Sequence, residues 1–272
     1  MKTDIGTPLL LTGEVNSTSG AGKLLPFNTA DFQAPARQAL LIEEFLFDNF
    51  VNGDTTSAGV KVRIGKHDIV PDPLPPFMLG VVPNRYAELH FSHYVTNCLG
   101  PVVWRLEEPI YVPPATAISI VAGNGVATTT YREMCVSILA RALPQDFPKP
   151  KTTKMPYVVG YVPSAAATRH YLKEDDLKNG LDGPVFVKHL VGRVLSSSGE
   201  DLTPGVADLL WLKYGTSEIC ADAPFNTVFD PCRRQLPLGL TLQPGECLTG
   251  RIQRNASSSP CLAMFCEREV SL

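Results

Sequence analysis

The first residues that could carry chemistry are two histidines, His90 and His93, because imidazole is a common metal ligand. Their neighbours Leu89, Phe91 and Tyr94 indicate an extended segment. In a strand, positions three apart point to opposite faces, so the two imidazoles would not share one ion. We therefore predict no metal site here.

A glycine-rich run, Ser19–Lys23, has the residues that end a phosphate-binding loop, in which backbone N–H groups and a lysine hold phosphates. The pattern is incomplete. Ser17 stands at the position of the first glycine, and Leu24 stands where a Ser or Thr would bind magnesium. We predict that no nucleotide or other cofactor binds.

Acidic residues recur as two pairs along the chain, Asp68 with Glu218 and Asp72 with Asp222. Two carboxylates close in space could hydrolyse a glycoside. Each pair, however, occupies matching positions of a repeat, and a single active site would seldom be duplicated. This recurrence favours a role in turns.

The seven cysteines are an odd number, and several lie in apolar runs, so we expect them to be reduced and partly buried. No Cys-x-x-Cys pair is present, which argues against zinc. No nucleophile elbow, metalloprotease helix or dinucleotide-binding turn occurs either. We predict that the protein is not an enzyme.

The chain contains an internal repeat. The segment Lys61–Gly65 is echoed by Trp211–Gly215, and the acidic pairs follow in step. A second echo matches Leu106, Ile110, Val112, Pro114 and Ala115 to Leu236, Leu240, Leu242, Pro244 and Gly245. A unit of roughly a hundred residues is the size of a folded domain. At 272 residues, the chain can hold two such domains.

The repeated segments have the pattern of β-strands. Leu236, Leu238, Leu240 and Leu242 alternate with residues such as Gln235 and Thr241, as in a strand with one buried face. The 21 glycines and 24 prolines suit short strands joined by turns. We predict an all-β protein whose core anchors are Trp104, Leu106, Ile110, Val112, Trp211, Leu236, Leu240 and Leu242.

Two segments lie outside the repeats, and we assign them to an N-terminal arm (1–38) and a connector (144–182) that flank domains at 39–143 and 183–272. In the connector, the charged run Tyr171–Asn179, followed by Gly180, predicts a short helical turn. In the arm, we expect the apolar residues Leu9, Leu10, Leu11, Leu24, Leu25, Phe27 and Phe32 to anchor on a neighbouring subunit.

The net charge of −3 and pI of about 6.0 give no electrostatic reason to expect nucleic acid as a partner. No apolar segment approaches the roughly 20 residues that span a bilayer, so we predict no membrane insertion. Residues 1–12 lack the features of a secretion signal, and we expect synthesis in a host cytoplasm.

Two motifs carry a resemblance to known proteins: Lys61–Gly65, and Trp104-Arg105-Leu106 followed by Pro113-Pro114. This pattern resembles structural proteins of tailed phages. Two tandem β-domains, each with a strand, a Pro-led turn and further strands, resemble the double jelly-roll proteins of virus particles. The resemblance implies two tandem jelly-roll-like β-sandwiches in a virion structural protein, with itself, as a homotrimer, and capsid subunits as partners.

The resemblance leaves open what the virion protein does. The mild acidity and lack of a basic arm favour a cement or decoration protein on the capsid exterior, held by residues 1–38. On this interpretation, removing 1–38 leaves both domains folded and weakens assembly. One alternative is a major capsid protein that forms the shell itself. A carbohydrate-binding or tail-spike β-sandwich is a further alternative.

Overall fold

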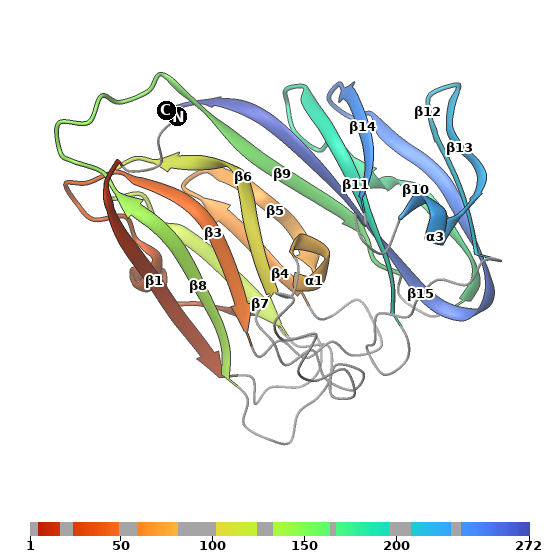
Figure 1. Ribbon diagram of the computed structural model, residues 1–272, viewed down its shortest axis with the longest axis horizontal. Helices are drawn as coiled ribbons and strands as arrows, with labels where there is room; N and C mark the ends of the chain where they lie inside the picture. Colours follow the sequence, from red (N-terminus) through yellow and green to blue (C-terminus); the bar gives the residue numbers. More distant parts are fainter. Residues whose placement is uncertain are drawn as a thin grey trace.

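The computed structural model describes residues 5–16, 24–48, 59–80, 102–123, 133–163, 167–195, 208–229 and 235–272. Strands make up most of them and form two β-sandwiches side by side (Figure 1). No helix in these ranges is long and apolar enough to cross a membrane.

The first sandwich consists of two four-stranded antiparallel sheets. Sheet A has the order β1 (Thr7–Asn16), β8 (Glu133–Ala142), β3 (Leu40–Asp48), β6 (Val102–Val112). Sheet B has the order β2 (Leu25–Pro26), β7 (Ile118–Gly123), β4 (Gly59–Ile64), β5 (His67–Leu74). A 3-10 helix, η1 (Thr29–Phe32), follows β2, and the short helix α1 (Pro76–Leu79) follows β5.

The second sandwich is also built from two sheets, which share the 25-residue strand β15 (Cys247–Ser271). The second part of β15 lies in sheet C, with the order β9 (Thr152–Tyr161), β15, β11 (Val185–Leu195), β14 (Gln235–Leu242). Its first part lies in sheet D, with the order β10 (Ala167–Lys178), β15, β12 (Leu209–Tyr214), β13 (Ser217–Pro224). The short helix α3 (Phe225–Val228) follows β13.

The two sandwiches have the same topology. If the two parts of β15 are counted separately, each sandwich has eight strands, ordered first-eighth-third-sixth in one sheet and second-seventh-fourth-fifth in the other. A short helix follows the fifth strand in both. Eight strands in this double Greek-key order define a jelly roll. The predicted all-β fold with two tandem jelly rolls is therefore confirmed.

Backbone geometry explains the internal repeat. Gly65 and Gly215 both have φ of 57° in the hairpins β4–β5 and β12–β13. Ala115 and Gly245, which the second echo aligns, have φ of 58° and 80° in the turns after β6 and β14. The repeat preserves the turns that require positive φ.

The segment predicted as an N-terminal arm belongs to the first jelly roll. Strand β1 pairs with β8 along its whole length, and β2 pairs with β7. Likewise β9 and β10, in the predicted connector, are the first two strands of the second jelly roll. By strand pairing the jelly rolls run from residue 7 to 142 and from 152 to 271.

The prediction of a helical turn at Tyr171–Asn179 was wrong, because this segment lies in β10. The pairing of β10 with β15 shifts register between Leu172 and Leu177. There the Asp176 carboxylate accepts a hydrogen bond from the backbone N–H of Lys173, and Asp175 pairs with Lys178 at 2.9 Å. A β-bulge places these charged residues outside the regular ladder, so the sequence lacks strand alternation.

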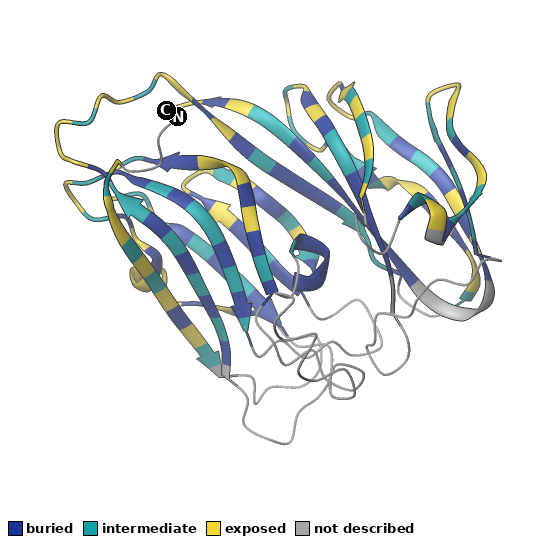
Figure 2. Cartoon of the chain, in the orientation of Figure 1, coloured by how far each residue is buried: buried dark blue, intermediate teal, exposed yellow. Residues whose placement is uncertain are grey.

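Buried residues recur along the strands of both sandwiches (Figure 2), and their apolar side chains form two main clusters. One lies within the second jelly roll. The other fills the first jelly roll and also contains residues of the second, among them Met155, Val158, Val191 and Ala263. The two domains therefore share part of one core.

Candidate assembly interface

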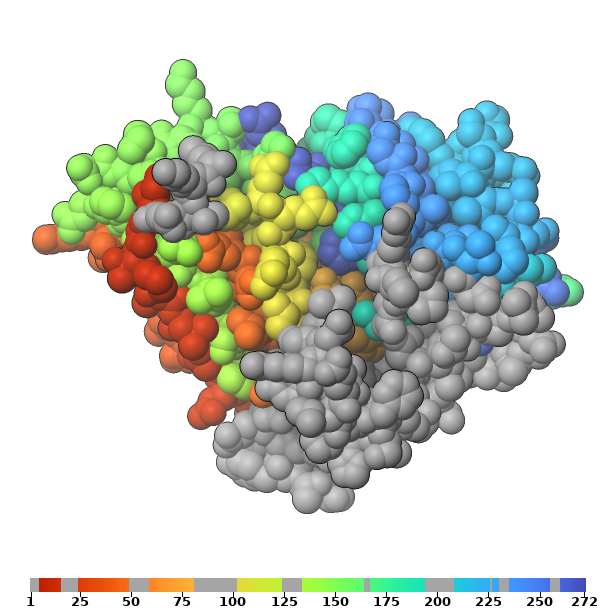
Figure 3. Space-filling model, viewed as in Figure 1, coloured from red at the N-terminus to blue at the C-terminus, as the bar shows by residue number. Residues whose placement is uncertain are grey.

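The two jelly rolls meet along a surface that we call the seam: the outer face of sheet C against β5, α1 and β6 of the first jelly roll. In Figure 3, β6 (yellow) lies at the border with the second jelly roll (teal to blue). Strand β15 contributes side chains to the cores of both jelly rolls. Its Leu262 and Met264 enter the second core, whereas Cys261 and Ala263 enter the first. Around these residues, sheet C is thus buried on both faces.

Aromatic side chains pack across the seam around Trp104 on β6. Its ring stacks on Phe45 with centroids 5.3 Å apart and meets Phe265 of β15 edge-on at 6.3 Å. On the other side, His189 of β11 stacks on Phe265 at 4.7 Å. Such aromatic pairs contribute stabilising free energy in addition to that from the apolar area that they bury. This row of rings therefore fixes β6 against sheet C.

Two arginines of the second jelly roll bind backbone of the first. Arg193 donates a hydrogen bond to the Gly80 carbonyl at 3.3 Å and lies 5.7 Å from the centroid of the Phe77 ring. Arg268 donates to the Asp68 carbonyl at 3.1 Å. Because these acceptors lie at the end of α1 and in β5, both bonds fix the relative position of the two jelly rolls.

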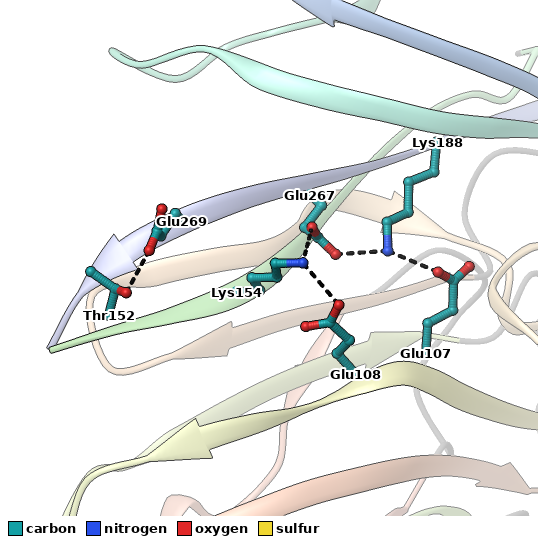
Figure 4. A network of polar contacts seen from close by, with 7 residues as sticks. All are labelled: Glu107, Glu108, Thr152, Lys154, Lys188, Glu267 and Glu269. Atoms are coloured by element: carbon teal, nitrogen blue, oxygen red, sulfur yellow. Dashed lines mark hydrogen bonds and ion pairs between the residues drawn. The ribbon is translucent and has the colours of Figure 1, made fainter. Parts of the chain in front are cut away.

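A network of five charged side chains closes the solvent side of the seam (Figure 4). Lys154 of β9 pairs with Glu108 at 2.8 Å and with Glu267 at 3.3 Å. Lys188 of β11 pairs with Glu107 at 2.8 Å and with Glu267 at 2.7 Å. Glu107 and Glu108 lie on β6, so both lysines link the two jelly rolls and share Glu267.

The network shifts the pKa of its members in the directions expected for ion pairs. Burial alone would raise the pKa of Glu267, but hydrogen bonds and charge from Lys188 and Lys154 outweigh it and lower that pKa. Burial would lower the pKa of Lys188, but its two carboxylate partners raise it. Hydrogen bonds from Glu108 and Glu267 raise the pKa of Lys154. All three groups are therefore charged at neutral pH.

The network borders a cleft of about 200 Å³ between the jelly rolls. Its walls include Leu79, Trp104, Lys154, Lys188 and Arg193. Each of its lysines already holds two carboxylates, and His189 stacks on Phe265. This arrangement suits a structural interface. In the described ranges, no group of three or more His, Cys, Asp or Glu residues could hold a metal ion.

The structure places most predicted core anchors in the interior. Trp104, Leu106, Ile110, Val112 and Leu242 are buried. Leu236 and Leu240 are only half-buried, although they pack against the second core.

Trp211 is half-buried and belongs to neither core cluster, contrary to the prediction. It lies on the outer face of sheet D, where its Nε1 donates to Glu218 at 3.1 Å and Lys213 and Arg251 lie near its ring. In β12, Leu210 and Leu212 point inward, so Trp211 between them must point outward.

The predicted arm anchors lie on the first jelly roll itself. Phe27 and Phe32 are buried in its core, with rings 5.9 Å apart, which corrects their assignment to a neighbouring subunit. Leu9, Leu11 and Leu25 are half-buried against the same core, and Leu24 is half-buried. Leu10 differs, because 60% of it is exposed.

Two of the acidic side chains considered for chemistry form ion pairs. Asp68 pairs with Arg63 across the β4–β5 hairpin at 3.7 Å, and Asp222 pairs with Arg251 at 2.9 Å. Cys220, Cys247 and Cys266 are free thiols. The predictions for Ser19–Lys23, His90, His93, Cys98 and Cys232 concern residues outside the described ranges.

Sequence reasoning missed the ionic network, since its members come from four strands distant in sequence. The apolar face of the seam, in contrast, can be recognised in the sequence. Tyr157, Val158 and Val159 form a continuous apolar run in β9, which is typical of a strand buried on both sides.

Comparisons with known proteins give a likeness in structure alone. No family model and no curated protein matches the sequence. Among solved structures, an atomic structure of Sulfolobus Turreted Icosahedral Virus aligns at TM-score 0.47 and 10% identity, over 96% of this chain and 90% of that one. The Faustovirus major capsid protein aligns at TM-score 0.46 and 7% identity, over 100% and 92%. The major capsid protein of bacteriophage PM2 aligns at TM-score 0.44 and 8% identity, over 97% and 98%.

With these TM-scores below 0.5, the fold assignment depends on the strand order of the chain itself. Both sandwiches have the eight-stranded jelly-roll order, and the seam joins them through a shared core. The chain is a double jelly-roll protein.

Proposed function

We propose that this chain is a major capsid protein of a virus, whose two jelly rolls form part of the shell as a homotrimer. The observation that carries the proposal is the fusion of two jelly rolls of identical topology into one block through a buried seam. Jelly rolls are a common capsid architecture, and a two-lobed block gives a trimer six similar lobes.

The position of the predicted arm within the first jelly roll favours a shell subunit over a cement protein. A clamp needs free apolar residues, but Phe27 and Phe32 are buried in the chain's own core and β1 pairs along its length with β8. We therefore place the shell role first. Decoration of the capsid exterior becomes the second possibility, supported by the mildly acidic charge of −3.

The proposed role is structural and needs no cofactor. The charged groups of the seam satisfy one another, as the lysine pairs with Glu107, Glu108 and Glu267 show. The proposed partners are other copies of this chain and further capsid subunits.

Electron microscopy of purified virus particles, with quantification of this protein, tests the proposal. A shell protein should be the most abundant virion component and form a continuous lattice of three-fold capsomers. Gentle removal of outer proteins should leave it in place. A particle whose shell stays intact after loss of this protein would identify a decoration protein and contradict the shell role.

One surface feature favours glycan binding as a second function. On the outer face of sheet D, Tyr171, Arg251 and Trp211 lie directly opposite one another on three neighbouring strands, and 62% of Tyr171 is exposed. Aromatic rings beside a cation form a flat surface that suits a sugar ring. Binding of the purified protein to a glycan array, lost in Tyr171→Ala, would support this function.

A further inference from the structure

The two jelly rolls expose equivalent strands to different extents. Strands β6 and β14 are the sixth strands of their jelly rolls and the outermost strands of sheets A and C. Leu106 and Ile110 of β6 are buried, whereas the aligned Leu236 and Leu240 of β14 are only half-buried. Leu238, between them, is half-buried as well. The seam covers β6, and the edge of the second jelly roll lacks such a cover within the described part of the chain.

The first jelly roll has an apolar area on the complementary surface. Leu10 of β1 projects from the outer face of sheet A and lies directly opposite Leu139 of β8. Leu46 of β3, also half-buried, lies on the same face opposite Ser137. Strands β1, β8 and β3 correspond to β9, the second part of β15, and β11, which form the sheet C side of the seam.

The seam shows how such an edge and such a face fit together. Within one chain, the β5–α1–β6 edge of the first jelly roll packs on the outer face of sheet C. The equivalent edge of the second jelly roll is β13, α3 and β14, and the equivalent face of the first is that of sheet A. Both equivalents lie on the surface of this chain.

We propose that the β13–α3–β14 edge of one copy packs on the outer face of sheet A of a second copy, repeating the seam between molecules. The inference rests on the proposed function and names the surfaces through which subunits would meet. On one side of the contact lie Leu236, Leu238 and Leu240; on the other lie Leu10, Leu46 and Leu139.

The partner is a second copy because both halves of the contact are present on every chain. The sheet A face is also more polar than its counterpart in sheet C. In sheet A, Thr12 lies opposite Ser137, and their hydroxyl oxygens are 3.0 Å apart. On the outer face of sheet C, the apolar residues Val158 and Phe265 lie opposite each other on the equivalent strands. A subunit that must fold before it assembles needs such a surface, since a fully apolar face would aggregate.

The contact joins two different surfaces, so it is head-to-tail, and successive copies continue the arrangement until a ring closes. This property provides the test. Leu10→Glu blocks the face and leaves the edge intact. Leu238→Lys blocks the edge and leaves the face intact.

Sedimentation velocity on the full-length protein measures the result. Wild type should form oligomers, and each variant alone should remain monomeric with an apparent dissociation constant raised at least about tenfold. An equimolar mixture should form a one-to-one heterodimer and nothing larger, because only one edge and one face remain usable. Arg169→Glu, an exposed substitution on β10 of sheet D, should assemble as wild type does.

Melting temperatures check that each variant is folded, and Leu236→Lys provides a second edge variant if Leu238→Lys unfolds. Wild-type assembly of Leu10→Glu, or a mixture that stays monomeric while wild type assembles, would overturn the proposed contact and leave the capsid role standing. A wild-type chain that is monomeric at every concentration and absent from particles would overturn both.

Discussion

At the scale of single residues, the two tryptophans have different roles despite their similar position in the predicted core. Trp104 is 4% exposed and contacts Phe45 and Phe265, whereas Trp211 is half-buried on the outer face of sheet D against Lys213 and Arg251. We expect Trp104→Ala to lower the free energy of unfolding by about 3 to 5 kcal/mol, because it leaves a cavity where both jelly rolls meet.

Chemical denaturation followed by circular dichroism measures this effect. Trp211→Ala is the matched control and should cost about 1 kcal/mol or less, since it removes a surface contact. Equal losses in the two variants would show that Trp104 does not anchor the seam.

Single residues also show what the sequence can predict. Buried positions such as Ile110 and Val112 follow from alternation and repetition, because both record which face of a strand is buried. Trp211 obeys the same alternation, but from the outer face: Leu210 and Leu212 carry the inward pattern. The size and apolar character of Trp211 predict a core position, but its place in the alternation of β12 puts its side chain on the outer face.

At the scale of elements, β1 and β2 change what the first 38 residues are expected to do. Their Gly, Ser and Thr content suggests an arm, but Leu9, Leu11 and Val15 alternate and pack against the core. The adjacent Leu10 hides this alternation, because it adds an apolar residue on the opposite face. The pairing of β1 with β8, distant in sequence, could not be predicted from local pattern.

Deletion of residues 1–38 should therefore unfold the first jelly roll. The deletion removes β1, β2 and the buried rings of Phe27 and Phe32, each of which contributes roughly 1.5 to 3 kcal/mol. Loss of the cooperative melting transition, measured by circular dichroism, is the expected result. Phe32→Ala is a milder version and should lower stability by about 3 to 5 kcal/mol. A truncated protein that melts as full-length does would restore the arm interpretation.

The ionic network of the seam predicts how stability depends on pH. The lowered pKa of Glu267 means that its contribution to stability is complete above the unfolded value of ~4.3 and is lost as pH falls through the folded value. The raised pKa of Lys188 means that its contribution is complete below ~10.4 and is lost as pH rises through the folded value. Between these limits the network should contribute a constant amount.

Glu267→Gln tests this dependence. At pH 7 we expect a loss of about 1 to 2 kcal/mol, because the pairs are only partly buried. The difference from wild type should shrink as the pH falls below ~4. Asp175→Asn breaks an exposed pair with Lys178 and serves as the control, with little change in melting temperature. A constant difference across the acidic range would show that Glu267 does not act through its charge.

At the scale of the whole molecule, sharing of a core determines how the chain unfolds. The internal repeat predicts two domains, because it describes each jelly roll by itself. The outer face of sheet C, with Ala263 and Val158, instead completes the first jelly roll. A repeat cannot reveal such a contact, since it relates the strands of one jelly roll to those of the other and carries no information on how the two pack together.

We expect the two jelly rolls to unfold in a single cooperative transition in differential scanning calorimetry, since the first jelly roll and the outer face of sheet C bury apolar surface against each other. Ala263→Asp places an unpaired charge in the seam and should separate the transition into two. Cys135→Asp introduces the same charge at the corresponding place on β8, on the outer face of sheet A, and should preserve one transition in the monomer. Two transitions in wild type would mean that the jelly rolls fold independently. The seam would then be a docking contact, and the rigid two-lobed block on which the capsid proposal depends would be lost.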